Sequence, residues 1–313
     1  MARRLLVSSI LLVCAAYPGS CNAMTAIQAT RLDNAPRVIV MSAFDPEMKQ
    51  LRSHTQITRT QVINGRKCYV GQLAGTDVVL VLSGMSMVNA AMMAQTAFDH
   101  FNALAIVFSG IAGGVNPNLE IGDVAVPAQW AEYQESVFAR QTAEGWIVAE
   151  PFARRQGDYG MMFTQHVHVT RKSAQPDIEE ERFWFPAAPT LLEVARGVVP
   201  QVRLSKCTAQ GDCLTHEPKI VVGGNGVSGP SFVDNSKYRD WVWRTFQADA
   251  LDMESAAIAH VAYTNDVPFI VFRSLSDLAG GGPDENEMGT FFQLAADNSA
   301  TVVEAFLREW AKR

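Results

Sequence analysis

The 313-residue chain lacks the excess of positive charge that a phosphate-backbone partner requires. Lysine and arginine total 26 against 32 acidic residues, which gives a net charge of -6. No lysine- and arginine-rich run occurs inside the chain. Proteins that bind nucleic acid usually present a basic patch. We therefore expect no nucleic-acid partner.

The chain also lacks a hydrophobic run long enough to cross a bilayer, which takes about 20 residues. The segment most similar to a membrane-spanning run is the N-terminus, "MARRLLVSSILLVCAAYPGSCNA". Two arginines are followed there by an apolar run over residues 5–16 and then by small residues. This order is typical of a secretory signal, and we expect a signal peptide over residues 1–23. The alternatives are a buried first helix, a membrane anchor, or a lipoprotein site at "PGSC". We expect an exported protein, periplasmic or secreted, without a stable membrane span.

Cysteine and histidine are sparse and are not spaced as metal ligands. Five cysteines include two in the leader, and the six histidines are scattered. Cys207 and Cys213 flank a polar "TAQGD" loop, and an oxidising compartment would permit a disulfide between them. The C-x-x-C spacing of a zinc site is missing, and two free surface thiols are the remaining alternative. We expect no metal and no organic cofactor.

Two common glycine patterns are missing from the glycine-rich stretch "SGIAGGVNPNLEIGDVAVP", residues 109–127. Its glycines match neither the dinucleotide pattern G-x-G-x-x-G nor the phosphate-loop pattern. The stretch follows the apolar run "LAIVF", which is typical of a buried strand. A glycine-rich turn at the end of such a strand lets the backbone approach a ligand closely. We expect a ligand other than a pyrophosphate here.

Strand-like and helical segments alternate along most of the chain. "RVIVM" at 37–41, "KIVVGG" at 219–224 and "PFIVFRSLSD" indicate strands, and a long helix closes the chain. Such alternation predicts a single α/β domain, a mixed central sheet flanked by helices, over residues 37–313. Residues 24–36 are expected to be a flexible junction. Residues from about 138 to 185 lose periodicity and are expected to form an insertion.

Acidic residues follow several predicted strands. Glu47 lies after the first, Glu254 after "ALDM", and Asp277 at the end of "PFIVFRSLSD". Each alone has a structural explanation, such as a solvated helix turn or a charge at a helix N-terminus. Three carboxylates at one sheet edge are costly unless a ligand uses them. They therefore indicate an active site.

Three segments of the chain resemble signature segments of the nucleoside phosphorylase/nucleosidase superfamily. They are "SGIAGGVNPNLEIGDVAVP", "LDMESAAIAHV" and "VPFIVFRSLSD". Within it the chain is most similar to the methylthioadenosine/S-adenosylhomocysteine nucleosidases. The resemblance implies hydrolysis of the N-glycosidic bond of a purine-type nucleoside, and it implies a homodimer. A phosphate-dependent phosphorylase and a non-catalytic storage protein of the same fold are the alternatives.

The resemblance also implies roles for individual residues. Asp277 would protonate the purine, and Glu47 would position the attacking water. Glu254 would bind ribose hydroxyls, with Met253 packed on the sugar. The remaining implied binding residues are Phe44, Ile111, Ala112, Gly113, Val227, Ser228, Arg273 and Ser276, of which Val227 and Ser228 stand where the family places an aromatic residue on the base.

Overall fold

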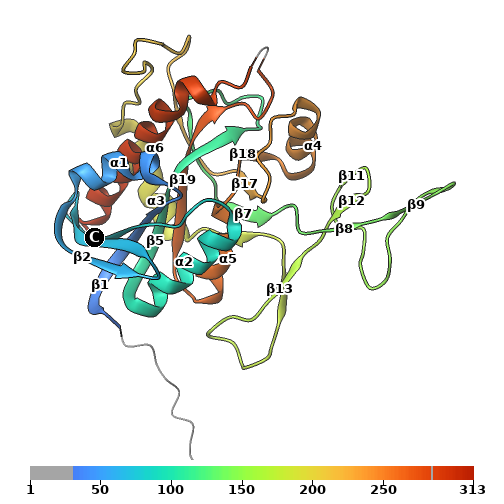
Figure 1. Ribbon diagram of the computed structural model, residues 1–313, viewed down its shortest axis with the longest axis horizontal. Coiled ribbons are helices and arrows are strands. Elements are labelled where there is room, and N and C mark those ends of the chain that lie inside the picture. The colour runs from blue at the N-terminus through green and yellow to red at the C-terminus, as the bar shows by residue number, and fades with distance from the viewer. Residues whose placement is uncertain (1–30, 283–284) are drawn as a thin grey trace, which may run out of the picture.

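The central feature of the protein is one twelve-stranded sheet, described by a computed structural model over residues 31–282 and 285–313 (Figure 1). The strands run in the order β15-β7-β17-β18-β5-β1-β4-β3-β2, with β19 beside β5 and β6, and β16 beside β6. Their bounds are β1 (Asp33–Ser42), β2 (Gln56–Ile63), β3 (Arg66–Leu73), β4 (Thr76–Leu82), β5 (Phe101–Gly114), β6 (Val124–Val126), β7 (Gln129–Glu132), β15 (Phe185–Pro186), β16 (Ile220–Val222), β17 (Asn225–Ser228), β18 (Ala248–Asp252) and β19 (Phe269–Asp277).

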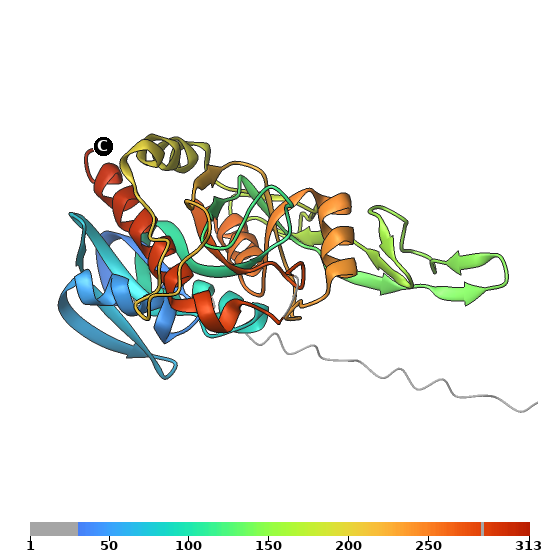
Figure 2. The same ribbon diagram turned by 90° about the horizontal axis from the view of Figure 1, so that it is seen from above.

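Helices cover the central strands on both faces. Strands β1, β5 and β19 run parallel to one another and carry unbroken runs of buried residues, as expected for strands covered on both sides. One group of helices packs around α6, which lies against β19, and α2 packs against α5 (Figure 2). The helices are α1 (Asp45–His54), α2 (Met87–His100), α3 (Pro189–Val198), α4 (Ser236–Phe246), α5 (Ser255–Thr264) and α6 (Met288–Trp310), with a 3₁₀ turn η1 (Val199–Gln201). The predicted fold class is confirmed.

The three strands β2, β3 and β4 form an antiparallel meander at one edge of the sheet. Both connecting turns have positive φ at their two central residues: 48° and 75° at Asn64 and Gly65, and 50° and 86° at Ala74 and Gly75. This is the geometry that suits two-residue hairpins. The Asn64-Gly65 pair is the sequence most typical of such a turn, whereas the Ala74-Gly75 pair is a less common one.

The first strand begins at Asp33, inside the segment 24–36 that was expected to be a flexible junction. Asp33 and Pro36 continue the pairing with β5, and Asp33 forms ion pairs with Arg37 and Arg59 at 2.5 and 2.6 Å. The strand was not predicted over this segment because its residues are mostly polar and show no strand pattern. The predicted signal peptide lies outside the described residues, as does most of the junction.

The segment expected as an insertion over 138–185 forms short antiparallel hairpins that project from the sheet (Figures 1 and 2). β8, β11 and β12 form one three-stranded sheet, and β9–β10 and β13–β14 are two-stranded. Their bounds are β8 (Ser136–Phe138), β9 (Arg140–Thr142), β10 (Gly145–Ile147), β11 (Asp158–Tyr159), β12 (Met162–Thr164), β13 (Val167–Val169) and β14 (Glu180–Arg182). Strands this short carry no readable periodicity, which is why the sequence predicted only an elaborated surface segment.

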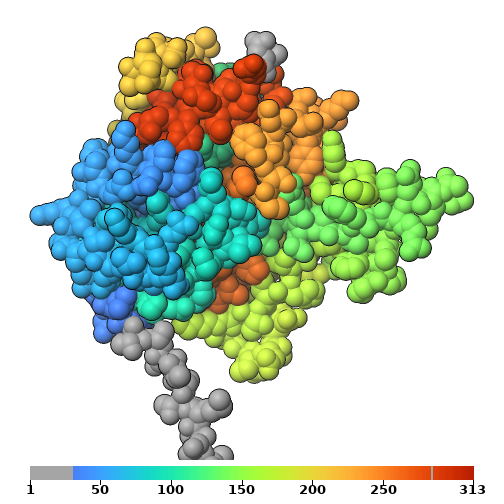
Figure 3. Space-filling model, viewed as in Figure 1, coloured from blue at the N-terminus to red at the C-terminus, as the bar shows by residue number. Residues whose placement is uncertain are grey.

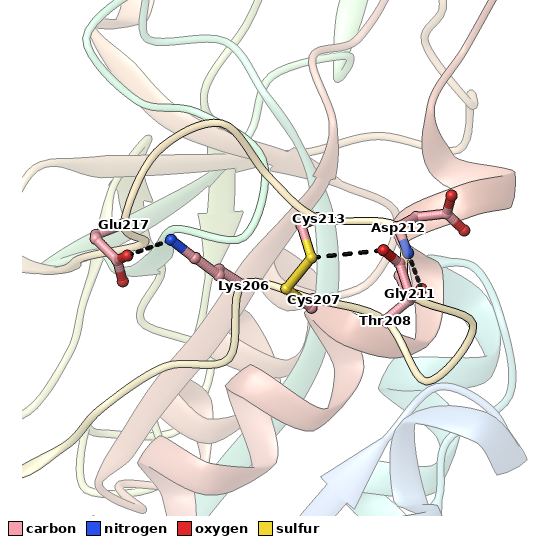
Figure 4. The surroundings of a disulfide bond; sticks show 7 residues. All are labelled: Lys206, Cys207, Thr208, Gly211, Asp212, Cys213 and Glu217. Carbon is pink, nitrogen blue, oxygen red and sulfur yellow. Dashed lines mark hydrogen bonds and ion pairs between the residues drawn. A yellow bond between two sulfur atoms is a disulfide. The ribbon is translucent and has the colours of Figure 1, made fainter.

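A disulfide joins Cys207 and Cys213 (Figure 4). Its loop is closed further by the Asp212 N–H, which donates to Thr208 Oγ1 at 3.2 Å, and by the ion pair of Lys206 with Glu217 at 2.6 Å. No group of three or more His, Cys, Asp or Glu side chains within residues 31–282 and 285–313 is placed to hold a metal ion. Within the same residues no helix is long and apolar enough to cross a membrane.

Candidate active site

A cavity of about 280 Å³ lies where the ends of β1, β5, β18 and β19 meet. The structure brings Glu47, Glu254 and Asp277 together in its lining, although they lie on three separate segments of the chain. Of the other residues singled out in the sequence, six line it: Phe44, Ile111, Ala112, Gly113, Met253 and Ser276. Convergence of several strand ends is the usual origin of a ligand site in an α/β sheet.

Glu47 lies in the first turn of α1 and is 2% exposed. Its Oε2 accepts a hydrogen bond from the Ala43 N–H at 2.7 Å, and its Oε1 accepts one from the Ile111 N–H at 2.9 Å. Burial raises the pKa of Glu47, whereas Arg273 and these N–H donors act in the opposite direction. Because the surrounding groups are donors, they favour a carboxylate, and the raised pKa makes that carboxylate a stronger base.

Arg273 does not reach the cavity; its side chain is fully buried beneath the acids. The guanidinium contacts three carboxylates: Asp252 at 2.6 Å, Glu254 at 3.1 Å and Glu47 at 3.4 Å. Its planar fork suits this arrangement, and the face of the guanidinium lies 4.2 Å from the centre of the Phe108 ring. Arg273 therefore holds the acids in place and has no free face to offer a ligand.

Glu254 follows β18 and is held from two sides. Its Oε1 accepts a hydrogen bond from the Ser86 N–H at 2.7 Å, and its Oε2 pairs with Arg273. Burial raises the pKa of Glu254 to about 7; Arg273 opposes this rise, and the charges of Asp252 and Glu47 add to it. Glu254 consequently changes charge close to neutral pH.

Asp252 fixes the turn that carries Met253 and Glu254. Its carboxylate accepts hydrogen bonds from the backbone N–H groups of Glu254 and Ser255, both at 3.2 Å, from the Ser255 hydroxyl, and from Arg273. The hydroxyl of Ser228 donates to it at 2.5 Å. The turn is thus held by a buried anion whose oxygens are fully hydrogen-bonded.

Asp277 is the last residue of β19 and is 2% exposed. Its Oδ2 accepts a hydrogen bond from the Ser276 hydroxyl at 2.9 Å, and its Oδ1 accepts one from the Ala279 N–H at 2.8 Å. Burial raises the pKa of Asp277, and these hydrogen bonds only partly offset the rise. A carboxyl group in such a place retains a proton more readily than an exposed one and is suited to donate it.

The structure does not place Val227 and Ser228 in the cavity. Both lie in buried strand β17, where Val227 packs in an apolar cluster and Ser228 supports Asp252. The loop that follows β17 supplies Phe232, whose side chain lines the cavity. An aromatic residue thus lines the cavity from "SGPSFVDN", four residues after Ser228, whereas the sequence indicated that the family's aromatic residue is replaced.

Seven further lining residues were not singled out as binding residues. Two come from α6, where Phe292 packs against Phe44 with ring centres 5.4 Å apart. Helical periodicity places such residues on a buried face, but it does not say which cavity they border. The seven are Met85, Ser231, Val233, Leu251, Asp252, Met288 and Phe292.

Residues 37–308 match the family model of the phosphorylase superfamily, and the chain belongs to this family. The resemblance seen in three short motifs is thus confirmed. The chain is 27% identical over 274 residues, 87% of this chain and 99% of the relative, to a 5'-methylthioadenosine/S-adenosylhomocysteine nucleosidase from Tolumonas auensis. It is also 26% identical over 227 residues, 70% of each chain, to bark storage protein B from Populus deltoides.

A solved structure of similar fold is 5'-methylthioadenosine/S-adenosylhomocysteine nucleosidase from Neisseria meningitidis in complex with methylthio-immucillin-A. The TM-score is 0.64 at 25% identity, and the match covers 87% of this chain and 98% of the other.

Proposed function

We propose that this protein hydrolyses the N-glycosidic bond of a purine-type nucleoside to free base and sugar. The observation that carries the proposal is the cavity itself, where Glu47, Glu254 and Asp277 converge. No lysine or arginine belongs to its lining among the described residues. A neutral ligand with hydroxyl groups and a basic ring nitrogen suits such a site.

Asp277 is proposed as the general acid. As the bond between the sugar carbon and the base nitrogen breaks, its electron pair moves to the base. Transfer of the Asp277 proton to a ring nitrogen, N7 in a purine, neutralises that charge. General acid catalysis of this kind contributes about 10²–10⁴-fold, and the raised pKa of Asp277 favours the protonated form that the step requires.

Glu254 and Met253 are proposed to hold the sugar. A carboxylate accepts hydrogen bonds from two ribose hydroxyls and so orients the ring. Its negative charge also favours the cationic sugar that develops as the base departs. Asp252 and Arg273 act through these residues and are positioning residues.

Glu47 is proposed to orient water as the nucleophile. The water oxygen bonds to the sugar carbon, and its proton passes to the Glu47 carboxylate. A phosphate nucleophile would instead need arginine or N–H groups directed at it. No arginine of the described residues lines the cavity, and Arg273, buried beneath it, is already paired with three carboxylates. The charged residues of the described lining are therefore all acidic, which supports water over phosphate.

The finer substrate assignment, a nucleoside like methylthioadenosine or S-adenosylhomocysteine, is supported by the Tolumonas auensis relative and by Phe232 in the cavity. A phosphate-dependent phosphorylase is the alternative of the same fold. The similarity to a bark storage protein supports a non-catalytic alternative. Retention of all three acids in one cavity favours an enzyme.

We further propose that the protein is exported and forms a homodimer. The leader sequence and the disulfide between Cys207 and Cys213 support export. The dimer is proposed by analogy with the family.

The test is a panel of purified nucleosides assayed for free base with and without phosphate. Base released at the same rate in both buffers, with free sugar as co-product, is the expected result. A requirement for phosphate with a sugar 1-phosphate product would establish the phosphorylase. Binding without any base release would establish the storage protein.

A further inference from the structure

A second hollow of about 720 Å³ adjoins the cavity and is walled on its far side by the inserted hairpins. Three residues of the loop between β17 and α4, Ser231, Phe232 and Val233, line both spaces. Phe138 from β8 and Met162 from β12 line only the hollow. The insertion thus extends the site beyond Phe232, and Figure 3 shows the inserted segments lying directly beside α4.

Aromatic contacts hold this wall against the body of the protein. The ring of Tyr159, on β11, meets that of Tyr238, on α4, edge-on with centres 4.8 Å apart, and it lies 5.4 Å from the ring of Trp241. Gln134 donates from Nε2 to the Tyr238 hydroxyl at 3.0 Å. These contacts fix the hairpins that line the hollow against α4.

The shared loop lies on the same side of the cavity as Asp277. The N–H of Asn235 donates to the Ala279 carbonyl at 3.0 Å, and the Ala279 N–H donates to Asp277 Oδ1. In a purine, N7 and a substituent on C6 lie on one edge of the ring. A base that presents N7 to Asp277 therefore directs its C6 substituent toward the loop and the hollow behind it.

The residues that line the hollow indicate which kind of C6 substituent would bind there. It is largely aromatic and apolar, and no lysine or arginine of the described residues contributes to it. Asp234 also lines it, and the negative charge of this residue disfavours anions. We propose that this hollow is a subsite for a large, uncharged aromatic or apolar group on the purine base, so that the protein accepts base-substituted nucleosides. This proposal rests on the proposed function.

The test compares adenosine with N6-benzyladenosine as substrates for wild type, Phe138→Ala and Phe152→Ala. Phe138 is 65% exposed and lines the hollow; Phe152 is 48% exposed, lies in the same insertion and does not line it. Loss of one aromatic contact should raise KM for N6-benzyladenosine by about three- to tenfold in Phe138→Ala. kcat should stay unchanged because the subsite is remote from the reacting atoms. Adenosine kinetics should not change in either variant, and Phe152→Ala should resemble wild type with both substrates.

The experiment distinguishes a wrong subsite proposal from a wrong nucleosidase proposal. Cleavage of adenosine with rejection of N6-benzyladenosine, or equal KM values in wild type and Phe138→Ala, would overturn the subsite alone. If neither of these nucleosides nor any nucleoside of the panel above is cleaved, the proposed function fails, and calorimetry with the free bases decides the subsite. Tighter binding of 6-benzylaminopurine than adenine, lost in Phe138→Ala, would support it; equal binding of the two bases would overturn it.

Discussion

Gly110 is the position where a single methyl group should disturb the site most. It lies on β5 opposite Arg273 of β19, and a Cβ added there would stand 2.0 Å from Arg273 Nη1 and 2.3 Å from Glu47 Oε1. Its backbone lies outside the positive-φ region, so Gly110→Ala acts through steric overlap alone. Neither neighbour has room to yield: Glu47 is held by two N–H groups and Arg273 by three carboxylates.

We expect Gly110→Ala to lower the free energy of unfolding by about 1–3 kcal/mol through overpacking, and by about 3–5 kcal/mol where the shift separates the buried ion pairs. Turnover should also fall, because Glu47 leaves the position from which we propose that it orients water. The measurements are urea denaturation and kcat/KM for base release.

Gly197→Ala is the matched control. Gly197 lies on α3, and no neighbouring atom stands within 4 Å of an added Cβ. Because alanine favours a helix more than glycine does, Gly197→Ala should raise the free energy of unfolding by about 0.5–1 kcal/mol. It should leave turnover unchanged. A Gly110→Ala protein with the stability and turnover of wild type would refute the packing argument.

Three further predictions follow from the site and the disulfide. Asp277→Asn removes the proton donor while keeping the shape of the side chain, so kcat should fall by at least about 10²-fold with a smaller change in KM; an unchanged kcat would remove Asp277 from the mechanism. The ionised form of Glu254 can accept from two ribose hydroxyls at once, and burial raises its pKa to about 7, so kcat/KM should rise with pH through that value. In Glu254→Gln this rise should disappear, and its persistence would assign it to another group. Non-reducing digestion and mass spectrometry of protein from the exported fraction should recover Cys207 joined to Cys213, whereas two alkylatable thiols would contradict the bridge.

The order of the long strands and helices was predictable because each carries its own periodicity, whereas the short strands of the insertion over 138–185 carry none. The positions of Glu47, Glu254 and Asp277 were predictable for a related reason: each follows a buried strand, and the strand ends meet at one edge of the sheet.

Features set by packing between distant segments were not predictable. Phe292 and Met288 reach the cavity from α6, and the sequence shows only that this helix has an apolar face. Arg273 was a candidate ligand residue by its position, and its three carboxylate partners became visible only in the fold. Phe232 was missed because Val227 and Ser228, five and four residues earlier, belong to the strand and not to the loop.

The most direct test of the central claim is single-turnover base release by Glu47→Gln in phosphate-free buffer. Glutamine keeps the length of the side chain and one oxygen acceptor but cannot take a proton from water. We predict that the variant binds its nucleoside within about threefold of wild type and releases base at least about 10²-fold more slowly. Base release at the wild-type rate would contradict the claim that Glu47 directs water to the sugar.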